Sequence, residues 1–479
     1  MKSGSSLDPK KLQSDIHTAL RAWRKTGGTP KSLLEALLLV QERRAEVAKD
    51  GSPTQLRLAT NLVLLDGMEE LASQDETAAR ILRLRFPEDN SLLMVANKLN
   101  ISEHTVSRLQ RTAIERLAAI GYGGELAWRE SRAQTVEALL PPPSYTHLFG
   151  LEDACATLVN LLAPKKEAPW VIAIVGIGGI GKTALADQVT RRIVRQFCFE
   201  RVIWLRIEPQ TMSGRSQSPS LTYENLVADL AQRLWPDAAE NLSPQQRQVR
   251  VRQALKAQPH LVIIDNLESE ADTAYLLERL NDLGQPSRFL LTSRTRLSEL
   301  AAVFNFSVDE LTLNDAESLI RHHAKDIGVS GVAMATEADI AAIYSVTGGN
   351  PLALKLVVSL LDTLPLPQIL NSLQDGRQGS VEALYRHIYL QAWQLLSPDA
   401  RTLLKAMPLV AESGGTPDYL RALSGLAEAQ LWPALQELRN RSLLEVRGTA
   451  VEKQYGIHRL TETFLQTEII HWPEVASEP

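Results

Sequence analysis

The sequence has few of the features that mark secreted or membrane proteins. Its two cysteines, Cys155 and Cys198, cannot form a disulfide framework, and no Cys and His residues have the paired spacing of a zinc site. No apolar run is long enough to span a bilayer, and no apolar segment follows the first residues as it would in a signal peptide. We therefore expect a cytoplasmic protein with no membrane partner.

A strong excess of charge is also missing. The 479 residues carry a net charge of −5, so nucleic acid would be attracted only by a local patch. Hydrophobic residues make up 44% of the chain, which is long enough for about three or four domains with cores of their own. The composition indicates a multidomain globular protein.

The stretch with the clearest chemistry is a glycine loop between an apolar run and a helical pattern. Strand, loop G-x-x-x-x-G-K-T and helix, in this order, form a phosphate-binding loop (P-loop). The glycines permit positive φ, so several N–H groups face a phosphate at the helix N-terminus. The lysine should reach the β- and γ-phosphates, and the threonine should bind Mg²⁺. The predicted nucleotide-binding residues are Gly176, Ile177, Gly178, Gly179, Ile180, Gly181, Lys182 and Thr183.

Beyond this loop, strand and helix patterns alternate, as is typical of a parallel α/β sheet. Asp265 ends a buried strand and is placed to hold Mg²⁺ through water, so we assign it a catalytic role beside Lys182. Asn266 follows, and an amide is a weak base. Glu268 is poorly placed to activate water, so hydrolysis should be slow. The expected strands are 171–175, 201–205, 261–265, 288–292 and 306–308.

Three further signals lie downstream. Arg294 follows an apolar strand at the same sheet edge, where its guanidinium either reports the γ-phosphate charge or forms a surface salt bridge. Pro351 opens a helix after a Gly-Gly-Asn turn, and it either starts that helix or covers an adenine face. Residues 431–460 have the helix, strand, turn, strand pattern of a winged helix.

The N-terminal part is helical in pattern, with three helices expected between residues 7 and 71. Residues 79–118 contain a short helix, a tight turn and a second helix, which together predict a helix-turn-helix. Residues 75–117 contain seven Lys or Arg and six Asp or Glu, a balance of +1, so DNA and a protein partner remain equal alternatives. The side chains placed to contact DNA are Ser102, with a second role as helix cap, His104, Thr105, Arg108 and Arg111.

Two resemblances follow from these motifs. Residues 95–106 resemble the DNA-reading region of sigma factors. Five ordered motifs resemble the NB-ARC type of nucleotide-binding module in the STAND class, which occurs in plant resistance proteins, apoptosome scaffolds and bacterial signalling proteins. The motifs are 176–183, 261–265, 292–294, 349–352 and 457–460.

The NB-ARC resemblance implies a module that closes around ADP and opens on exchange for ATP, with Mg²⁺. It implies that Pro351 lies beside the adenine, that Arg294 reads the γ-phosphate, and that His458 holds the ADP β-phosphate and locks the winged helix shut. Phe149, before the first helix of the module, is assigned to the nucleotide site as well. The chain stops soon after the winged helix, so we expect a separate sensor or effector protein.

The expected fold class is multidomain α and α/β: an all-α N-terminal region with a helix-turn-helix, a P-loop parallel α/β NTPase domain, a helical domain and a C-terminal winged helix. Two functions remain open: a switch that assembles with copies of itself when ATP-bound, or a transcription regulator that binds DNA. A simple ATPase is disfavoured by the missing base. The expected boundaries are 1–70, 71–122 for the helix-turn-helix, 123–147 for a linker marked by glycines and prolines, 148–312, 313–375 and 376–479.

Overall fold

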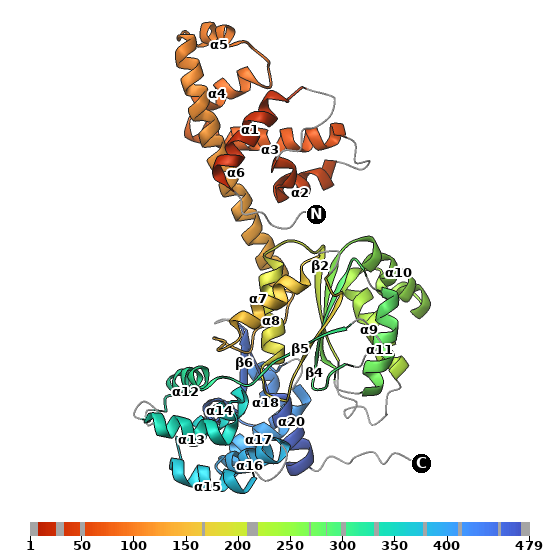
Figure 1. The fold of residues 1–479 in the computed structure, drawn as a ribbon, viewed down its shortest axis with the longest axis vertical. Coiled ribbons are helices and arrows are strands. Elements are labelled where there is room, and N and C mark those ends of the chain that lie inside the picture. Colours follow the sequence, from red (N-terminus) through yellow and green to blue (C-terminus); the bar gives the residue numbers. More distant parts are fainter. Residues whose placement is uncertain are drawn as a thin grey trace. The chain divides into compact units, whose positions relative to one another are not determined.

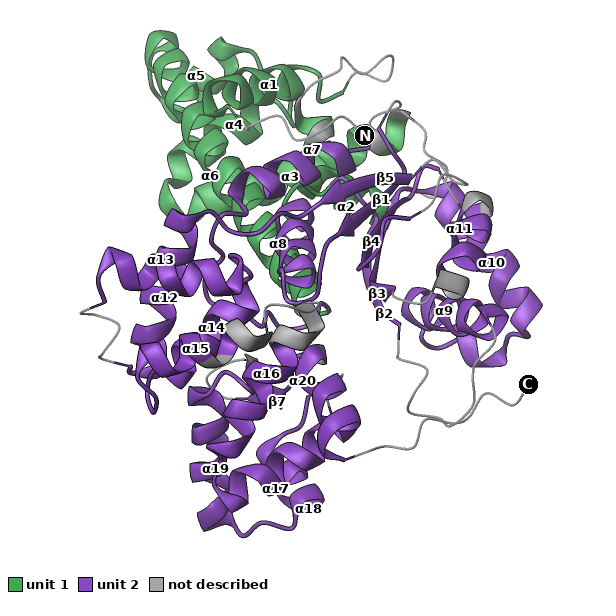
Figure 2. Ribbon diagram, turned by 60° about the horizontal axis from the view of Figure 1, so that its bottom comes forward, with its two compact units in different colours: residues 1–139, 195–197 green, residues 140–194, 198–479 purple. Residues whose placement is uncertain are grey.

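A computed structural model of the chain gives two compact units, residues 1–139 with 195–197, and residues 140–194 with 198–479 (Figure 2). Each unit is treated by itself below. The structure describes residues 8–24, 33–47, 53–164, 168–207, 219–267, 270–283, 285–297, 303–329, 335–376, 381–410, 414–448 and 452–470.

The first unit is helical throughout its described residues. Its core contains fully buried side chains from several helices, among them Leu12, Met68, Leu82 and Leu117. The helices are α1 (Pro9–Arg21), η1 (Leu33–Ala36), α2 (Leu38–Val47), α3 (Pro53–Gln74), α4 (Glu76–Arg85), α5 (Leu92–Leu99) and α6 (Glu103–Glu137) (Figure 1).

Helices α4, α5 and α6 form the predicted helix-turn-helix. Ser102 begins α6 because its hydroxyl accepts the N–H of Thr105 at 3.2 Å, as expected of a helix cap. Asn100 ends α5 in the left-handed region at φ +56°, which turns the chain sharply between the two helices. Val95 and Val106 are fully buried between them. The motif is therefore a packed unit with its own small core.

The expectation of a linker from residue 123 is wrong, because α6 continues unbroken through the glycines at 121–124 to Glu137. Glu125 is fully buried, and its two carboxylate oxygens accept the N–H groups of Leu38 and Leu39 at 3.1 Å each, at the start of α2. Arg129 also donates to it at 2.8 Å. A helical glycine costs about 1 kcal/mol relative to alanine. These contacts across the unit offset that cost.

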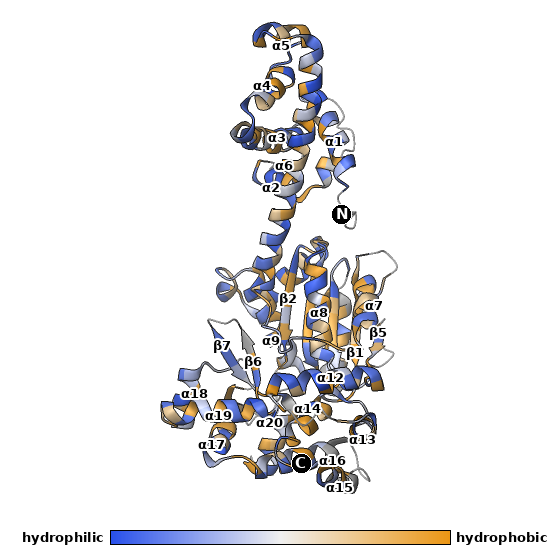
Figure 3. Ribbon diagram, turned by 90° about the vertical axis from the view of Figure 1, so that its left-hand side faces the viewer, coloured by the Kyte–Doolittle hydropathy of each residue, from blue (hydrophilic) through white to orange (hydrophobic). Residues whose placement is uncertain are grey.

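The second unit is built around a parallel sheet with strand order β2-β3-β4-β1-β5. The strands carry mostly apolar residues (Figure 3), and α7 and α8 lie on one side of the sheet while α9, α10 and α11 lie on the other (Figure 1). The expected strands are present, except that the last lies at Val303–Ser307. The others are β1 (Val171–Val175), β2 (Arg201–Arg206), β3 (His260–Leu267) and β4 (Arg288–Ser293). The helices are α7 (Glu152–Leu162), α8 (Lys182–Val194), α9 (Pro219–Leu234), η3 (Ala239–Asn241), α10 (Pro244–Ala257) and α11 (Glu270–Leu283).

The rest of this unit is helical apart from one antiparallel hairpin, β6 (Glu445–Gly448) with β7 (Lys453–Gly456), as a winged helix requires. A single hydrophobic core extends from Leu311 to Leu465, so the helical and winged-helix segments pack together. None of the described helices is long and apolar enough to cross a membrane. The helices are α12 (Leu313–Ile327), α13 (Glu337–Thr347), α14 (Pro351–Leu360), α15 (Leu366–Gly376), α16 (Val381–Gln394), α17 (Pro398–Ala406), η5 (Met407–Val410), α18 (Pro417–Ser424), α19 (Glu428–Asn440), α20 (Arg459–Phe464) and η6 (Leu465–Ile469).

Candidate functional site

The glycine loop connects β1 to α8, as its spacing predicts. Gly179 and Gly181 have φ of +75° and +101°, which other residues adopt only with strain. Lys182 begins α8, and its ammonium donates to the carbonyls of Gly176 at 2.8 Å and Ile177 at 2.9 Å. The lysine therefore lies over the loop that it is expected to serve, at a helix N-terminus suited to a phosphate.

Two hydroxyls meet the carboxylate predicted to hold Mg²⁺. Thr183 donates to Oδ1 of Asp265 at 2.9 Å, and Thr292 donates to the same oxygen at 2.6 Å. Asp265 is only 2% exposed, so its charge is held by these donors within the sheet. Carboxylate and hydroxyl oxygens are the ligands that Mg²⁺ prefers, so Thr183 and Asp265 fit the ion. Thr292 was not singled out from the sequence, because its role depends on β4 lying beside β3.

Asn266 is engaged through both its backbone and its side chain. It sits at a β-bulge between Ile264 and Leu267 with φ +75°, and its backbone N–H donates to the hydroxyl of Thr292 at 2.8 Å. Its side-chain amide donates to the carbonyl of Ile207 at 3.0 Å. The amide therefore ties β3 to the end of β2. Glu268 lies outside the described residues.

His458 comes from the winged helix and lies among the basic residues of the loop and sheet. Burial above all, together with the charges of Lys182, Arg206 and Arg294, lowers its pKa to about 4, against the opposing charge of Glu445. Its Nδ1 accepts the N–H of Leu460 at 3.1 Å as the cap of α20. A neutral ring that accepts at Nδ1 carries its proton on Nε2, which is the donor that a phosphate oxygen needs.

The structure thus brings together four groups that lie far apart in the sequence. Arg294, directly after β4, acts electrostatically on His458, as Lys182 does, and its role as a γ-phosphate sensor stays a prediction. Arg206 was missed by the sequence analysis, although a basic residue ending a strand next to the Asp265 strand is the signal that finds it. Three cations around one histidine give the positive potential that favours a polyanion.

The start of α14 packs on the glycine loop. Asn350 caps this helix, with its Oδ1 facing the N–H groups of Leu352 and Ala353, and its Nδ2 donates to the carbonyl of Gly178 at 3.0 Å. Pro351 is the first residue of the helix, as predicted, and is carried to the loop by this contact. Tyr385 of α16 also donates to Oδ1 of Asn350, a contact that no sequence pattern indicated.

Phe149 lies in a ring cluster, and its assignment to the nucleotide site stays a prediction. Its ring centroid is 4.6 Å from that of His147 and 5.5 Å from that of His322 on α12. Gly150, with φ +66°, lets the chain turn from this cluster into α7. The cluster offers an aromatic face next to the first helix of the nucleotide-binding domain.

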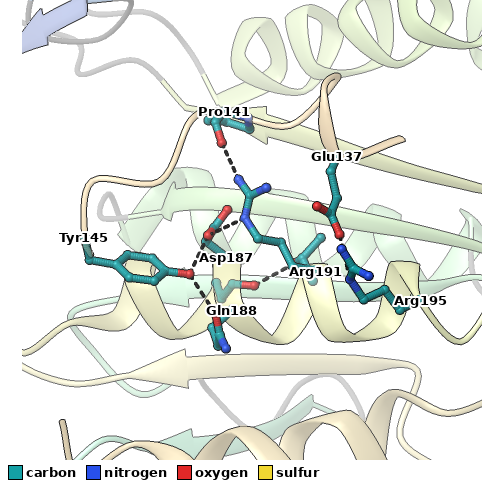
Figure 4. Close-up of polar contacts among 9 residues, drawn as sticks. Glu137, Pro141, Tyr145, Asp187, Gln188, Arg191 and Arg195 are labelled. Atoms are coloured by element: carbon teal, nitrogen blue, oxygen red, sulfur yellow. Dashed lines mark hydrogen bonds and ion pairs between the residues drawn. The ribbon is translucent and has the colours of Figure 1, made fainter. Parts of the chain in front are cut away.

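The segment before Phe149 is fastened to α8 (Figure 4). The hydroxyl of Tyr145 contacts Oδ2 of Asp187 at 2.7 Å, and Arg191 donates to the same carboxylate at 2.8 Å. Arg191 also donates to the carbonyl of Pro141 at 2.8 Å. Burial, followed by the nearby Asp187, raises the pKa of Tyr145, so the hydroxyl keeps its proton and remains a donor. The chain that leads to Phe149 is therefore held in a fixed register on the P-loop helix.

The residues predicted to contact DNA divide into two groups. Ser102 and Thr105 are engaged at the start of α6, where their hydroxyls lie 2.8 Å apart. His104, Arg108 and Arg111 are exposed on the face opposite the buried Val106. Ser102 therefore serves the helix cap, and the exposed three form the surface available to a partner.

Comparison with known proteins agrees with this geometry. Residues 151–324 match the family described as the NB-ARC domain, and residues 71–119 match sigma-70, region 4. Residues 151–324 therefore form an NB-ARC domain, and residues 71–119 form a helix-turn-helix of the sigma-70, region 4 type. The NB-ARC match covers α7 to α12, that is, the P-loop, Asp265 and Arg294, but it ends before the winged helix.

Relatives of this NB-ARC protein are found in plants and bacteria. It is 25% identical over 340 residues to the disease resistance RPP13-like protein 1 of Arabidopsis thaliana, covering 64% of this chain and 31% of that protein. It is 26% identical over 323 residues to a WD repeat-containing protein of a Nostoc species, covering 63% and 25%. The chain therefore spans less than a third of the length of these relatives. Among solved structures, a STAND protein with a tetratricopeptide repeat sensor from Pyrococcus horikoshii matches with a TM-score of 0.43 and 19% identity, covering 68% of this chain and 43% of that one.

Proposed function

We propose that this NB-ARC protein is a nucleotide-operated signalling switch. It binds ADP with Mg²⁺ at rest and assembles with copies of itself on exchange for ATP. The NB-ARC match of residues 151–324 supports a nucleotide-dependent switch in general terms. The observation that carries the finer proposal is the position of His458, which shares the field of Lys182, Arg206 and Arg294 while its own helix packs on the loop. A Cβ added to Gly178 would lie 3.2 Å from Leu460.

Slow hydrolysis belongs to the same proposal. The residue after Asp265 is Asn266, whose amide is engaged with Ile207 and is too weak a base to activate water. A switch that must hold ATP long enough to assemble gains from slow turnover. Partners in this scheme are further copies of the chain and a separate sensor or effector protein, and the setting is the cytoplasm.

One preparation tests the switch. The nucleotide that copurifies with the protein is identified by chromatography, ATP turnover is measured, and mass is followed by light scattering with ADP and with a non-hydrolysable ATP analogue. We expect ADP to copurify with the protein. ATP turnover should be well below about 1 per second, the lower end of the range of ordinary enzymes. The molar mass of the protein in solution should rise with the ATP analogue and not with ADP. In Lys182→Ala, ADP should be lost, because the cation that lies over the P-loop is removed. Rapid turnover without any change of mass would instead indicate a simple ATPase.

A second function is favoured by the helix-turn-helix. The sigma-70, region 4 match and the exposed His104, Arg108 and Arg111 support a transcription regulator that binds DNA through α6. The two functions are compatible if DNA is the target of the ATP-bound assembly. A protein partner on the same face is the alternative, and salt-dependent binding of the full chain to duplex DNA separates the two.

A further inference from the structure

A second connection between the P-loop and the winged helix runs through α16 and does not involve His458. It begins at the carbonyl of Gly178, which accepts from Asn350 at 3.0 Å and lies 3.4 Å from the hydroxyl of Tyr385. The same hydroxyl donates to Oδ1 of Asn350. Since a phenol has one proton to donate, Tyr385 donates it to Asn350, which is the shorter contact. Asn350 in turn holds the loop by donating to Gly178.

The loop packs closely against Tyr385 at Gly179. A Cβ added to Gly179 would lie 2.6 Å from the Tyr385 hydroxyl oxygen and 2.8 Å from Cβ of Leu352. Tyr385 is 3% exposed, and burial raises its pKa, so the hydroxyl stays protonated and its donor role is constant with pH. A change in the loop at Gly178 or Gly179 must therefore displace Asn350, Tyr385 or both.

Tyr385 is coupled in turn to α20. Tyr389 lies one helical turn further along α16, and the two rings are stacked with centroids 6.2 Å apart. Tyr389 stacks on Phe464 of α20 at 5.2 Å, and its hydroxyl accepts from Thr461 at 3.1 Å. Tyr389 and Thr461 are each 1% exposed. Packed aromatic rings at these distances move together, because a shift of one opens a void beside the next.

We propose that Tyr385 and Tyr389 are positioning residues that form a relay from the P-loop to α20. Tyr385 fixes the loop through Asn350, and Tyr389 fixes α20, whose first turn carries His458. The relay rests on the proposed switch and adds a second route to it. In this relay, a change in loop conformation shifts Tyr385, then Tyr389 and then α20 of the winged helix. His458, in contrast, would bind the phosphate itself.

The test compares ADP release from Tyr385→Phe, Tyr389→Phe and the double variant, measured by stopped flow with a fluorescent ADP. Each single change removes one hydroxyl and keeps the ring, so circular dichroism should show folded protein. We expect each to release ADP about three- to tenfold faster, the effect of one lost hydrogen bond on the closed state. Because the two residues act in series, the double variant should be no faster than the faster single variant. Tyr419→Phe, on the surface of α18 and 53% exposed, is the matched control and should be unchanged.

Amide hydrogen exchange distinguishes the relay from a loss of stability limited to the surroundings of the substituted side chain. In ADP-loaded Tyr389→Phe, we expect faster exchange of the amides at 178–181, because the relay connects Tyr389 to the loop through the ring and hydroxyl of Tyr385. Faster exchange restricted to α16 and α20 would overturn the relay. So would an ADP release rate in the double variant that is raised by the product of the two single effects. If His458→Ala releases ADP faster while both tyrosine variants match the wild type, the relay is wrong and the switch stands. If neither the wild type nor Lys182→Ala binds ADP, the switch fails and the relay falls with it.

Discussion

At the scale of single residues, neighbouring side chains of the site share hydrogen-bond partners. Oδ1 of Asp265 takes two hydroxyl donors, and one of these, Thr292, also accepts the N–H of Asn266 at 2.8 Å. A buried carboxylate held in this way needs little rearrangement to bind a hydrated Mg²⁺, because Thr183 already lies beside it. Thr292 thereby joins the metal site to the bulge that aims Asp265.

Replacing Thr292 should therefore affect both stability and metal response. Thr292→Val leaves the N–H of Asn266 without its acceptor, which should lower the free energy of unfolding by about 1–3 kcal/mol. It should also weaken Mg²⁺-dependent ATP binding, measured by calorimetry with and without Mg²⁺. Thr190→Val is the control, since the Thr190 hydroxyl is fully buried and bonds only to Ala186 within α8. An equal loss of Mg²⁺ response in both variants would contradict the role of Thr292.

A single buried side chain, His458, should also make the stability of the nucleotide-free protein depend on pH. The pKa of His458 falls from 6.5 to about 4 on folding, mainly by burial. Between these values the unfolded chain binds a proton that the folded chain does not, so stability falls as pH drops from 6.5 toward 4. The loss is at most about 3 kcal/mol. Urea unfolding across this range should show the loss in the wild type relative to His458→Gln, and parallel curves for the two would remove His458 from the cause.

At the scale of elements, α6 carries the helix-turn-helix at one end and a buried carboxylate further along. Glu125 binds the first N–H groups of α2, where the positive end of that helix favours an anion. The position of the DNA-facing part of α6 is thus tied to the core of the first unit. The same helix presents Arg108 and Arg111 on its exposed side.

Removal of this carboxylate should loosen the first unit. Glu125→Ala leaves two backbone donors and the guanidinium of Arg129 without their acceptor, at a cost of about 3 kcal/mol. Thermal unfolding by circular dichroism should show a lower midpoint for this variant. Glu115→Ala removes an exposed carboxylate from the same helix and should leave the midpoint nearly unchanged. Similar midpoints for the two variants would show that the cap contributes little.

At the scale of the whole molecule, the helix-turn-helix has too little charge for tight DNA binding by one copy. Its local balance of +1 provides few phosphate contacts, whereas several copies in an assembly bind together far more tightly. The two proposed functions are joined by this argument. In the proposed scheme, assembly comes first and DNA binding follows from it.

DNA binding should therefore appear only when the protein is loaded with ATP. We expect no retention of duplex DNA by the ADP form of the full chain at physiological salt, and retention by the form loaded with an ATP analogue, in a gel-shift assay. The double variant Arg108→Ala with Arg111→Ala should keep the mass of the assembly and lose DNA. Tight, sequence-specific binding by the monomeric ADP form would make the transcription regulator the primary function.

The sequence by itself determined the parts of this protein that depend on local chemistry. The P-loop, the cap at Ser102 and the proline at the start of α14 are set by residues within a few positions of one another, so spacing alone predicts them. The strand that carries Asp265 is equally local, since its apolar run is buried on both sides of a parallel sheet.

Only the tertiary structure decided the features that depend on distant partners. The helix through residues 121–124 persists because Glu125 meets α2, which no local pattern records. Thr292, Arg206 and Tyr385 join the site because β4, β2 and α16 are brought to the loop by packing. His458 becomes part of a cationic site because α20 rests on Gly178, a contact across most of the domain. Such pairings are set by burial and strand order, and a single sequence does not contain them.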